Sequence, residues 1–253
     1  MLNSIPTGLD ALAQNAHAGQ WSLDDDIDWD QDIRVPRWLP RRLAVSLVSQ
    51  FLYGEHATLE VCERLRKTLG GDVSKACLGF QIADERRHAQ AYTRYLERLG
   101  DVARPDPAMA ATVAAMDEWD GPVEGYLAAY HILLEGEALR SIEGIADVLP
   151  CGLFRAIGRR VAVDEARHVA FGRLLLIERL PRLALDERRQ IYRWVRHLWR
   201  DGAGRTLDEF RVPGVMTRGL RQRWLEEGWQ RHRRSLMDVG LLAPEEVAKM
   251  EAA

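Results

Sequence analysis

One pattern, Asp-Glu-x-Arg-His, occurs twice in this chain, as DERRH at residues 84–88 and as DEARH at residues 164–168. At the same offset of 80, residues 47–99 align with residues 127–179 without a gap. Both copies lie in apolar stretches with helical periodicity. We therefore expect two helical hairpins with the same interior, which together make a four-helix bundle with pseudo-twofold symmetry. The coinciding pairs include Leu47/Leu127, Glu55/Glu135, Leu59/Leu139, Glu63/Glu143 and Leu69/Leu149.

The rest of the chain also has the periodicity of helices, and the sequence predicts an all-α fold without β-hairpins. Glycine and proline mark the expected helix ends, as in Gly70-Gly71 and in RPDP at residues 104–107. The expected helices cover residues 41–68, 73–99, 107–118, 122–149, 150–180, 186–210 and 216–236, with a short one after Pro244.

The domain organisation follows from composition. The 253 residues are 47% hydrophobic, and no Gly/Ser-rich or Pro-rich linker divides them. We expect a single helical domain over residues 37–253, with a bundle core at 41–180 and accessory helices at 181–253. Residues 1–36 are polar and acidic, and we expect an extended or loosely ordered N-terminal arm.

Charge and cysteine content exclude several classes of protein. The net charge of −3 does not indicate a nucleic-acid or membrane protein. Three cysteines without a CxxC pair make neither a disulfide framework nor a zinc ribbon, and they suit a reducing compartment. No secretory signal and no run of 18 apolar residues is present, so we expect a cytoplasmic protein that does not bind a membrane.

The repeat brings together side chains that bind metals. Glu85 and His88 are three residues apart and project from one helix face, as do Glu165 and His168. Each pair has a glutamate 30 residues ahead, Glu55 or Glu135. Carboxylates on an apolar face must be paired or bind a metal, because burying an isolated charge is too costly. Four carboxylates and two imidazoles are the ligand set of two metal ions in a helix bundle, and oxygen-rich sites favour iron or manganese over structural zinc.

Several alternatives stay open at this stage. The repeated acidic and basic residues could form salt bridges on exposed helix faces of a metal-free binding or scaffold module. Glu137 competes with Glu135 as a ligand, since both lie in the sequence EGE, but Glu135 is preferred because it matches Glu55 without a gap and lies on the more apolar face. His131, one turn before Glu135, could also join the site, whereas His56 beside Glu55 points away from it.

These motifs resemble those of the ferritin-like diiron carboxylate superfamily, over residues 40–180. The Asp-Glu-x-Arg-His form is similar to that of the bacterial multicomponent monooxygenase hydroxylases and of the ribonucleotide reductase small subunit. The resemblance implies that Asp84 and Asp164 each hydrogen-bond a ligand histidine across the site and fix its tautomer. It also places Tyr92, four residues after His88, where the reductase forms its tyrosyl radical; a pocket-lining role is the alternative.

Other members of the superfamily give weaker matches. The sequence WSLDDDIDW resembles a stretch of the arylamine N-oxygenases, but Val161 stands where those enzymes carry a third histidine. The run RGLRQRWLEEGWQRHRR near the C-terminus is predicted to be an amphipathic helix that packs Trp224 and Trp229 on the bundle. Docking of an acidic partner such as an acyl carrier protein, or binding of nucleic acid, is the alternative for this run.

The resemblance implies an O2-activating non-haem diiron oxygenase or oxidase that acts on a small organic substrate. Hydroxylation, N-oxidation, desaturation and C–C cleavage are all compatible with the motifs. Two Fe ions are the expected cofactor, with Mn or mixed Mn/Fe as alternatives. A separate electron donor and a homodimer are expected, and a ferroxidase or a peroxide-detoxifying protein of ferritin or rubrerythrin type is the rival function. The predicted apolar lining of the substrate pocket is Phe51, Leu52, Ile82, Leu139 and Val161.

Overall fold

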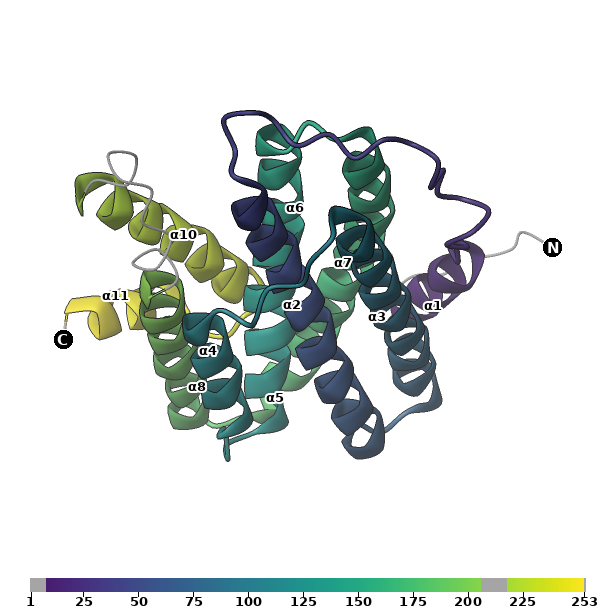
Figure 1. The fold of residues 1–253 in the computed structure, drawn as a ribbon. Helices are drawn as coiled ribbons and strands as arrows, with labels where there is room; N and C mark the ends of the chain where they lie inside the picture. The colour runs from purple at the N-terminus through teal and green to yellow at the C-terminus, as the bar shows by residue number, and fades with distance from the viewer. Residues whose placement is uncertain (1–7, 206–217, 253) are drawn as a thin grey trace. The chain divides into compact units, whose positions relative to one another are not determined.

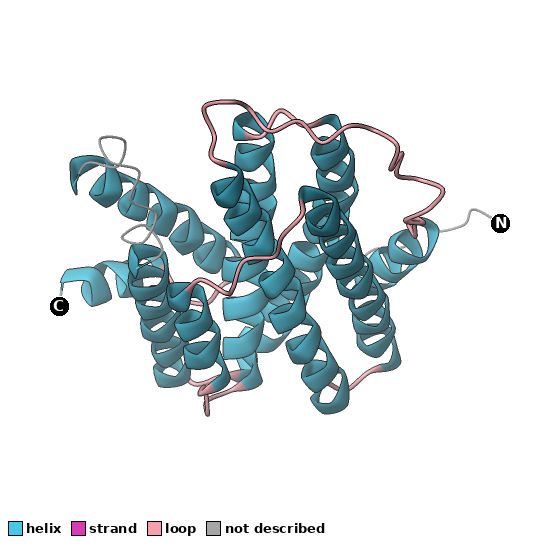
Figure 2. Cartoon of the chain, viewed as in Figure 1, coloured by secondary structure: helices cyan, strands magenta, loops and turns pink. Residues whose placement is uncertain are grey.

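A computed structural model describes residues 8–205 and 218–252 of the chain, and in this part every regular element is helical (Figure 2). The all-α prediction is therefore confirmed. The described residues form two compact units. Unit 1 comprises residues 8–105 and 135–171, and unit 2 comprises residues 106–134, 172–205 and 218–252. The prediction of one domain over residues 37–253 stays a prediction.

The two predicted hairpins supply the long helices of Figure 1, within one or two residues of the expected bounds at most ends. In the first, α2 (Arg41–Thr68) and α3 (Asp72–Leu99) run antiparallel. The connection turns at Gly71, whose φ of 88° suits glycine, and α3 ends at Gly100 in the left-handed region. In the second, α6 (Glu135–Val148) leads into α7 (Gly152–Arg179), whose residues up to Phe171 belong to unit 1.

The core of unit 1 contains side chains from both hairpins, such as Val48, Tyr95 and Phe154, which are completely buried. Burying one side chain of this size contributes about 1.5–3 kcal/mol. The same core includes Trp21 and Ile27 from the N-terminal segment. The apolar stripes predicted from periodicity therefore do face one interior.

The prediction of an extended or loosely ordered arm is wrong for residues 9–18, which form a helix. Helix α1 (Leu9–Ala18) packs against α3, and two of the acidic residues that follow, Asp24 and Asp26, pair with arginines of α3 and α7. Asp24 lies 2.8 Å from Arg94, and Asp26 lies 2.6 Å from Arg160. The acidic composition that indicated disorder is explained by these partners, which are distant in the sequence.

The two hairpins differ in the residues that precede Glu55 and Glu135. The helix expected at residues 122–149 is continuous, but it begins as α5 (Val123–Tyr126), continues as the π-helix η1 (Leu127–Leu134), and returns to α-helix at Glu135. The corresponding residues 47–54 of α2 are regular α-helix. A π-helix has wider turns than an α-helix, so the predicted identical interiors do not extend to this stretch.

Unit 2 contains α4 (Pro107–Asp117), α8 (Leu185–Leu198), the π-helix η3 (Trp199–Ala203), α10 (Arg218–Asp238) and α11 (Pro244–Ala252). The accessory helices expected after residue 181 are thus present. The predicted boundaries at 210 and 216 lie outside the described residues. Within residues 8–205 and 218–252, no helix combines the length and the apolar character needed to cross a bilayer.

Candidate metal centre

The six predicted metal ligands come together inside unit 1. Glu55 projects from α2, Glu85 and His88 from α3, Glu135 from the start of α6, and Glu165 and His168 from α7. All six residues are at most 7% exposed. They form two overlapping groups of candidate ligands, in each of which the ligand atoms lie within 4.8 Å of one another. The groups are Glu55, Glu85, His88 and Glu165, and Glu85, Glu135 and His168.

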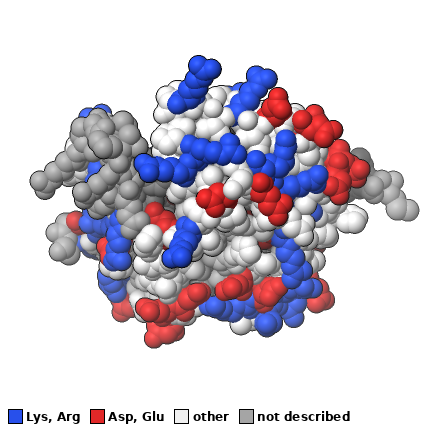
Figure 3. All heavy atoms as spheres, in the orientation of Figure 1, with Lys and Arg blue, Asp and Glu red and all other residues white. Residues whose placement is uncertain are grey.

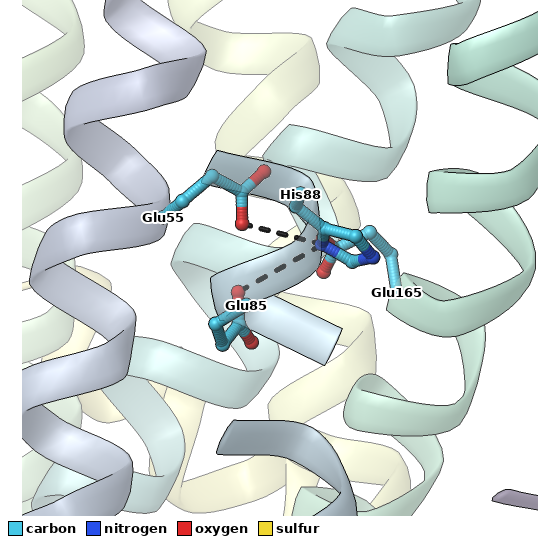
Figure 4. Close-up of side chains that lie close together, drawn as sticks. All are labelled: Glu55, Glu85, His88 and Glu165. Atoms are coloured by element: carbon cyan, nitrogen blue, oxygen red, sulfur yellow. Dashed lines mark hydrogen bonds and ion pairs between the residues drawn. The ribbon is translucent and has the colours of Figure 1, made fainter. Parts of the chain in front are cut away.

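The first group surrounds the Nδ1 atom of His88 (Figure 4). Glu55 Oε2 lies 3.3 Å from this nitrogen, Glu165 Oε1 lies 3.4 Å from it, and Glu85 Oε2 lies 3.9 Å from it. The carboxylates reach His88 from three different helices. Such convergence on one ring nitrogen is what a bound cation requires.

The second group has the same form around Nδ1 of His168. Glu85 Oε1 lies 3.2 Å from this nitrogen, Glu165 Oε2 lies 3.3 Å from it, and Glu135 Oε2 lies 3.8 Å from it. Glu85 and Glu165 therefore present one oxygen to each histidine. Glu85 thus belongs to both groups, and Glu165, a member of the first group, also reaches the histidine of the second.

The outer nitrogens of both histidines contact aspartates of the opposite hairpin. His88 Nε2 lies 3.0 Å from Asp164 Oδ2, and His168 Nε2 lies 3.3 Å from Asp84 Oδ2. The crossed contact implied by the resemblance is therefore present. An N–H at Nε2 that donates to the aspartate leaves the Nδ1 lone pair directed at the carboxylates, which is the tautomer a metal ligand needs.

Four residues outside the predicted set hold these aspartates. Arg87 pairs with Asp84, and Arg167 pairs with Asp164 and also lies 3.2 Å from Asp84 Oδ2. From the N-terminal segment, Gln20 donates to Asp84 at 3.1 Å and the Trp21 indole donates to Asp164 at 2.7 Å.

The two arginines could have been found from the sequence, because arginine recurs at the same place in both pentapeptides. Gln20 and Trp21 carry no such signal. The sequence separation between the Trp21 indole and Asp164 is 143 residues, and no periodicity links them.

Burial and mutual repulsion determine the protonation of the cluster. Burial raises the pKa of Glu85 and of Glu135, and neighbouring carboxylates raise both pKa values further. Burial also acts on Glu165, but hydrogen bonds from Glu135 and His168 hold the pKa of Glu165 well below its usual value. Although burial alone would lower them, nearby carboxylates raise the pKa values of His88 and His168. Protons thus neutralise part of the negative charge that metal ions would otherwise balance.

The donor set fits two divalent cations. Four carboxylates match the charge of two such ions, and each ion would have one imidazole and several oxygens. Glu85 Oε2 is buried and has no hydrogen-bond partner among the described residues, which is costly for a carboxylate oxygen unless a ligand occupies the site.

The other candidates are placed as follows. Glu137 is paired with Arg140 at 3.7 Å and belongs to neither group, so Glu135 is the residue of α6 that joins the cluster. His131 is buried but belongs to neither group, and His56 is exposed. Tyr92 is fully buried and stacks on Phe51 with ring centroids 5.4 Å apart. Burial and the negative charge of Glu55 raise the pKa of Tyr92, as expected for a phenol near the carboxylates.

The Arg/Trp-rich run forms α10 in unit 2. Trp224 stacks on Trp199, and Trp229 packs edge-on against Tyr192. The two tryptophans that were predicted to pack on the bundle pack instead against the accessory helix α8 and the π-helix η3. On the face drawn in Figure 3, basic and acidic side chains both occur among uncharged surface, in agreement with the small net charge.

Comparison with known proteins identifies solved structures with the same fold. No family model and no curated protein matches the sequence. Among solved structures, an R2-like ligand-binding oxidase variant with an aerobically reconstituted Mn/Fe cofactor matches with a TM-score of 0.72 at 18% identity, over 92% of this chain and 94% of that one. The chain has the fold of the R2-like ligand-binding oxidases.

A second match supports this assignment of the fold. The R2-like ligand-binding oxidase from Sulfolobus acidocaldarius gives a TM-score of 0.69 at 17% identity, over 95% of this chain and 94% of that one. The ferritin-like architecture expected from the motifs is thereby confirmed.

Proposed function

We infer that this chain is an oxidase or oxygenase that binds two redox-active metal ions, activates O2 and acts on a small organic substrate. The observation that carries the inference is the orientation of the two histidines. Each Nδ1 faces carboxylates from several helices, while each Nε2 is held by an aspartate from the opposite hairpin. A surface salt-bridge face would be exposed, whereas these side chains are buried.

Iron and manganese are the metals we propose. Oxygen-rich ligand sets with one imidazole for each ion suit both elements. Solved structures with this fold carry Mn/Fe cofactors, which supports two Fe ions or a mixed Mn/Fe pair here. Two such ions would supply the electrons and the open coordination positions that O2 reduction needs.

The side chains have separate tasks in this proposal. Glu85 and Glu165 present one oxygen to each histidine and would bridge the ions, whereas Glu55 and Glu135 would each bind one ion. Asp84 and Asp164 keep the proton on the outer histidine nitrogens.

The apolar residues around the cluster would keep bulk water out. Val161 is fully buried, and Ile82 and Leu52 are nearly so, whereas Phe51 and Leu139 are partly buried. Exclusion of water protects reactive species and strengthens the electrostatic interactions within the site. We propose that Tyr92 and Phe51, which stack on each other, form the part of the substrate pocket nearest Glu55.

The partners are also proposed. Electrons would come from a separate protein or from the substrate itself. A homodimer and an acidic carrier protein as substrate donor fit the same proposal, as does a cytoplasmic location.

Anaerobic titration of the metal-free protein with Fe(II) tests the proposal. We expect saturation at two ions for each chain in the wild type and fewer in His88→Ala. His56→Ala is the matched control, because His56 is exposed and adjoins a ligand in the same helix. Binding of less than one ion by the wild type, or equal losses in both variants, would refute the metal centre.

Addition of O2 to the loaded protein then separates the two candidate functions. An oxygenase is expected to consume O2 in proportion to an added organic substrate and reductant. A ferroxidase would instead oxidise excess Fe(II) turnover after turnover without a substrate, and that result would replace the oxygenase assignment.

A further inference from the structure

Gln81 is a buried polar residue that touches the candidate metal ligands and has no place among them. It lies one helical turn before Glu85 in α3 and is 3% exposed. Its Nε2 atom lies 3.1 Å from Glu85 Oε1 and 3.1 Å from Glu135 Oε1. One carboxamide therefore donates to carboxylates from two helices.

This contact breaks the twofold repeat of the site. At the offset of 80, Gln81 corresponds to Val161, and the carboxylates that Gln81 contacts correspond to Glu165 and Glu55. Val161 is fully buried and cannot donate a hydrogen bond. The amide thus acts on only one of two otherwise matching pairs of carboxylates.

The oxygens that Gln81 contacts belong to the ligand group of His168. Its bond to Glu135 Oε1 leaves Oε2 of the same carboxylate facing Nδ1 of His168 at 3.8 Å. Its bond to Glu85 Oε1 fixes the oxygen that lies 3.2 Å from the same nitrogen. Hydrogen bonds from a neutral donor favour ionised carboxylates and restrict their rotation, and both effects favour metal binding.

We propose that Gln81 is a positioning residue that strengthens binding at the metal position of Glu85, Glu135 and His168, and so makes the two metal positions unequal. This inference rests on the proposed two-metal site. It deepens that proposal by assigning to one side chain the difference between positions that the sequence repeat would make alike.

The test uses Gln81→Met, which keeps the length of the side chain and removes the N–H donors. It is combined with single-histidine variants that each retain one position. Mn(II) is titrated into the metal-free proteins, and free Mn(II) is measured by electron paramagnetic resonance. In the His88→Ala background, where the His168 position remains, Gln81→Met is expected to weaken Mn(II) binding about 10–100-fold.

The His168→Ala background is the matched control. There Gln81→Met is expected to weaken Mn(II) binding much less, because Gln81 contacts neither Glu55 nor the Glu85 oxygen that faces His88. Val161→Ala in both backgrounds controls for altered packing, and circular dichroism verifies folding. Equal effects of Gln81→Met in the two backgrounds, or none in either, would overturn the inference. If the wild-type chain binds no Mn(II) and no Fe(II), the two-metal proposal fails first, so the two failures are distinguishable.

Discussion

The hydrogen bond between Trp21 and Asp164 is expected to hold the N-terminal segment on the bundle, and Trp21→Phe tests it. The indole nitrogen lies 2.7 Å from Asp164 Oδ2, with Trp21 6% and Asp164 1% exposed. Phenylalanine keeps an aromatic ring in the core and removes the donor. A hydrogen bond to a charged group contributes about 1.5–3 kcal/mol, and we expect the free energy of unfolding to fall by that amount.

The assay is thermal and denaturant unfolding of the metal-free protein. For a chain of this size, about 1.5–3 kcal/mol corresponds to a decrease in Tm of about 3–12 °C. Trp38→Phe is the matched control, because Trp38 is 69% exposed and its replacement should change stability by less than about 0.5 kcal/mol.

A double-mutant cycle isolates the bond itself. Trp21→Phe and Asp164→Asn should show a coupling energy of about 0.5–3 kcal/mol, since the two side chains are in direct contact. If Trp21→Phe is as stable as Trp38→Phe, or if the two changes are additive, the indole does not anchor the segment and the reasoning is wrong.

Further predictions concern the site and the packing of both units. Metal affinity should fall as the pH falls. The pKa values of His88 and His168 are raised, so a metal ion must displace protons from these histidines. Mn(II) titrations should show about a tenfold loss of affinity per pH unit for each proton released, and an affinity that does not change with pH would contradict this. Glu251→Ala should cost about 1–3 kcal/mol in denaturant unfolding, because it leaves the buried Trp229 indole without its acceptor at 2.8 Å. Gly172→Ala should lower the Tm, since a Cβ there would lie 2.2 Å from the Cβ of His131 and overpacking costs about 1–3 kcal/mol or more. Gly144→Ala, with nothing within 4 Å, should instead raise stability by about 0.5–1 kcal/mol, and equal effects of the two changes would refute the packing argument.

The sequence by itself determined the helices of the bundle and the residues that gather at its centre. Helical periodicity and the spacing of Glu85 and His88 depend on residues three or four apart, and that relation is local. The repeat, which aligns without a gap, then predicted the same arrangement in the second hairpin and favoured Glu135 over Glu137 as the ligand. The crossed contacts of Asp84 and Asp164 required more than spacing, and they followed from the resemblance to a known superfamily.

Only the tertiary structure decided how the site is completed. Gln20 and Trp21 come from a segment whose acidic composition indicated disorder, and their partners lie far away in the sequence. In the sequence, nothing distinguishes Gln81 from other helix residues. Its contact with Glu135 exists only because the fold brings the two residues together. The π-helix at Leu127–Leu134 could not be predicted from the sequence either, because these residues align without a gap with residues 47–54, which form regular α-helix. Such features depend on which surfaces meet in the folded chain, and local periodicity does not encode that.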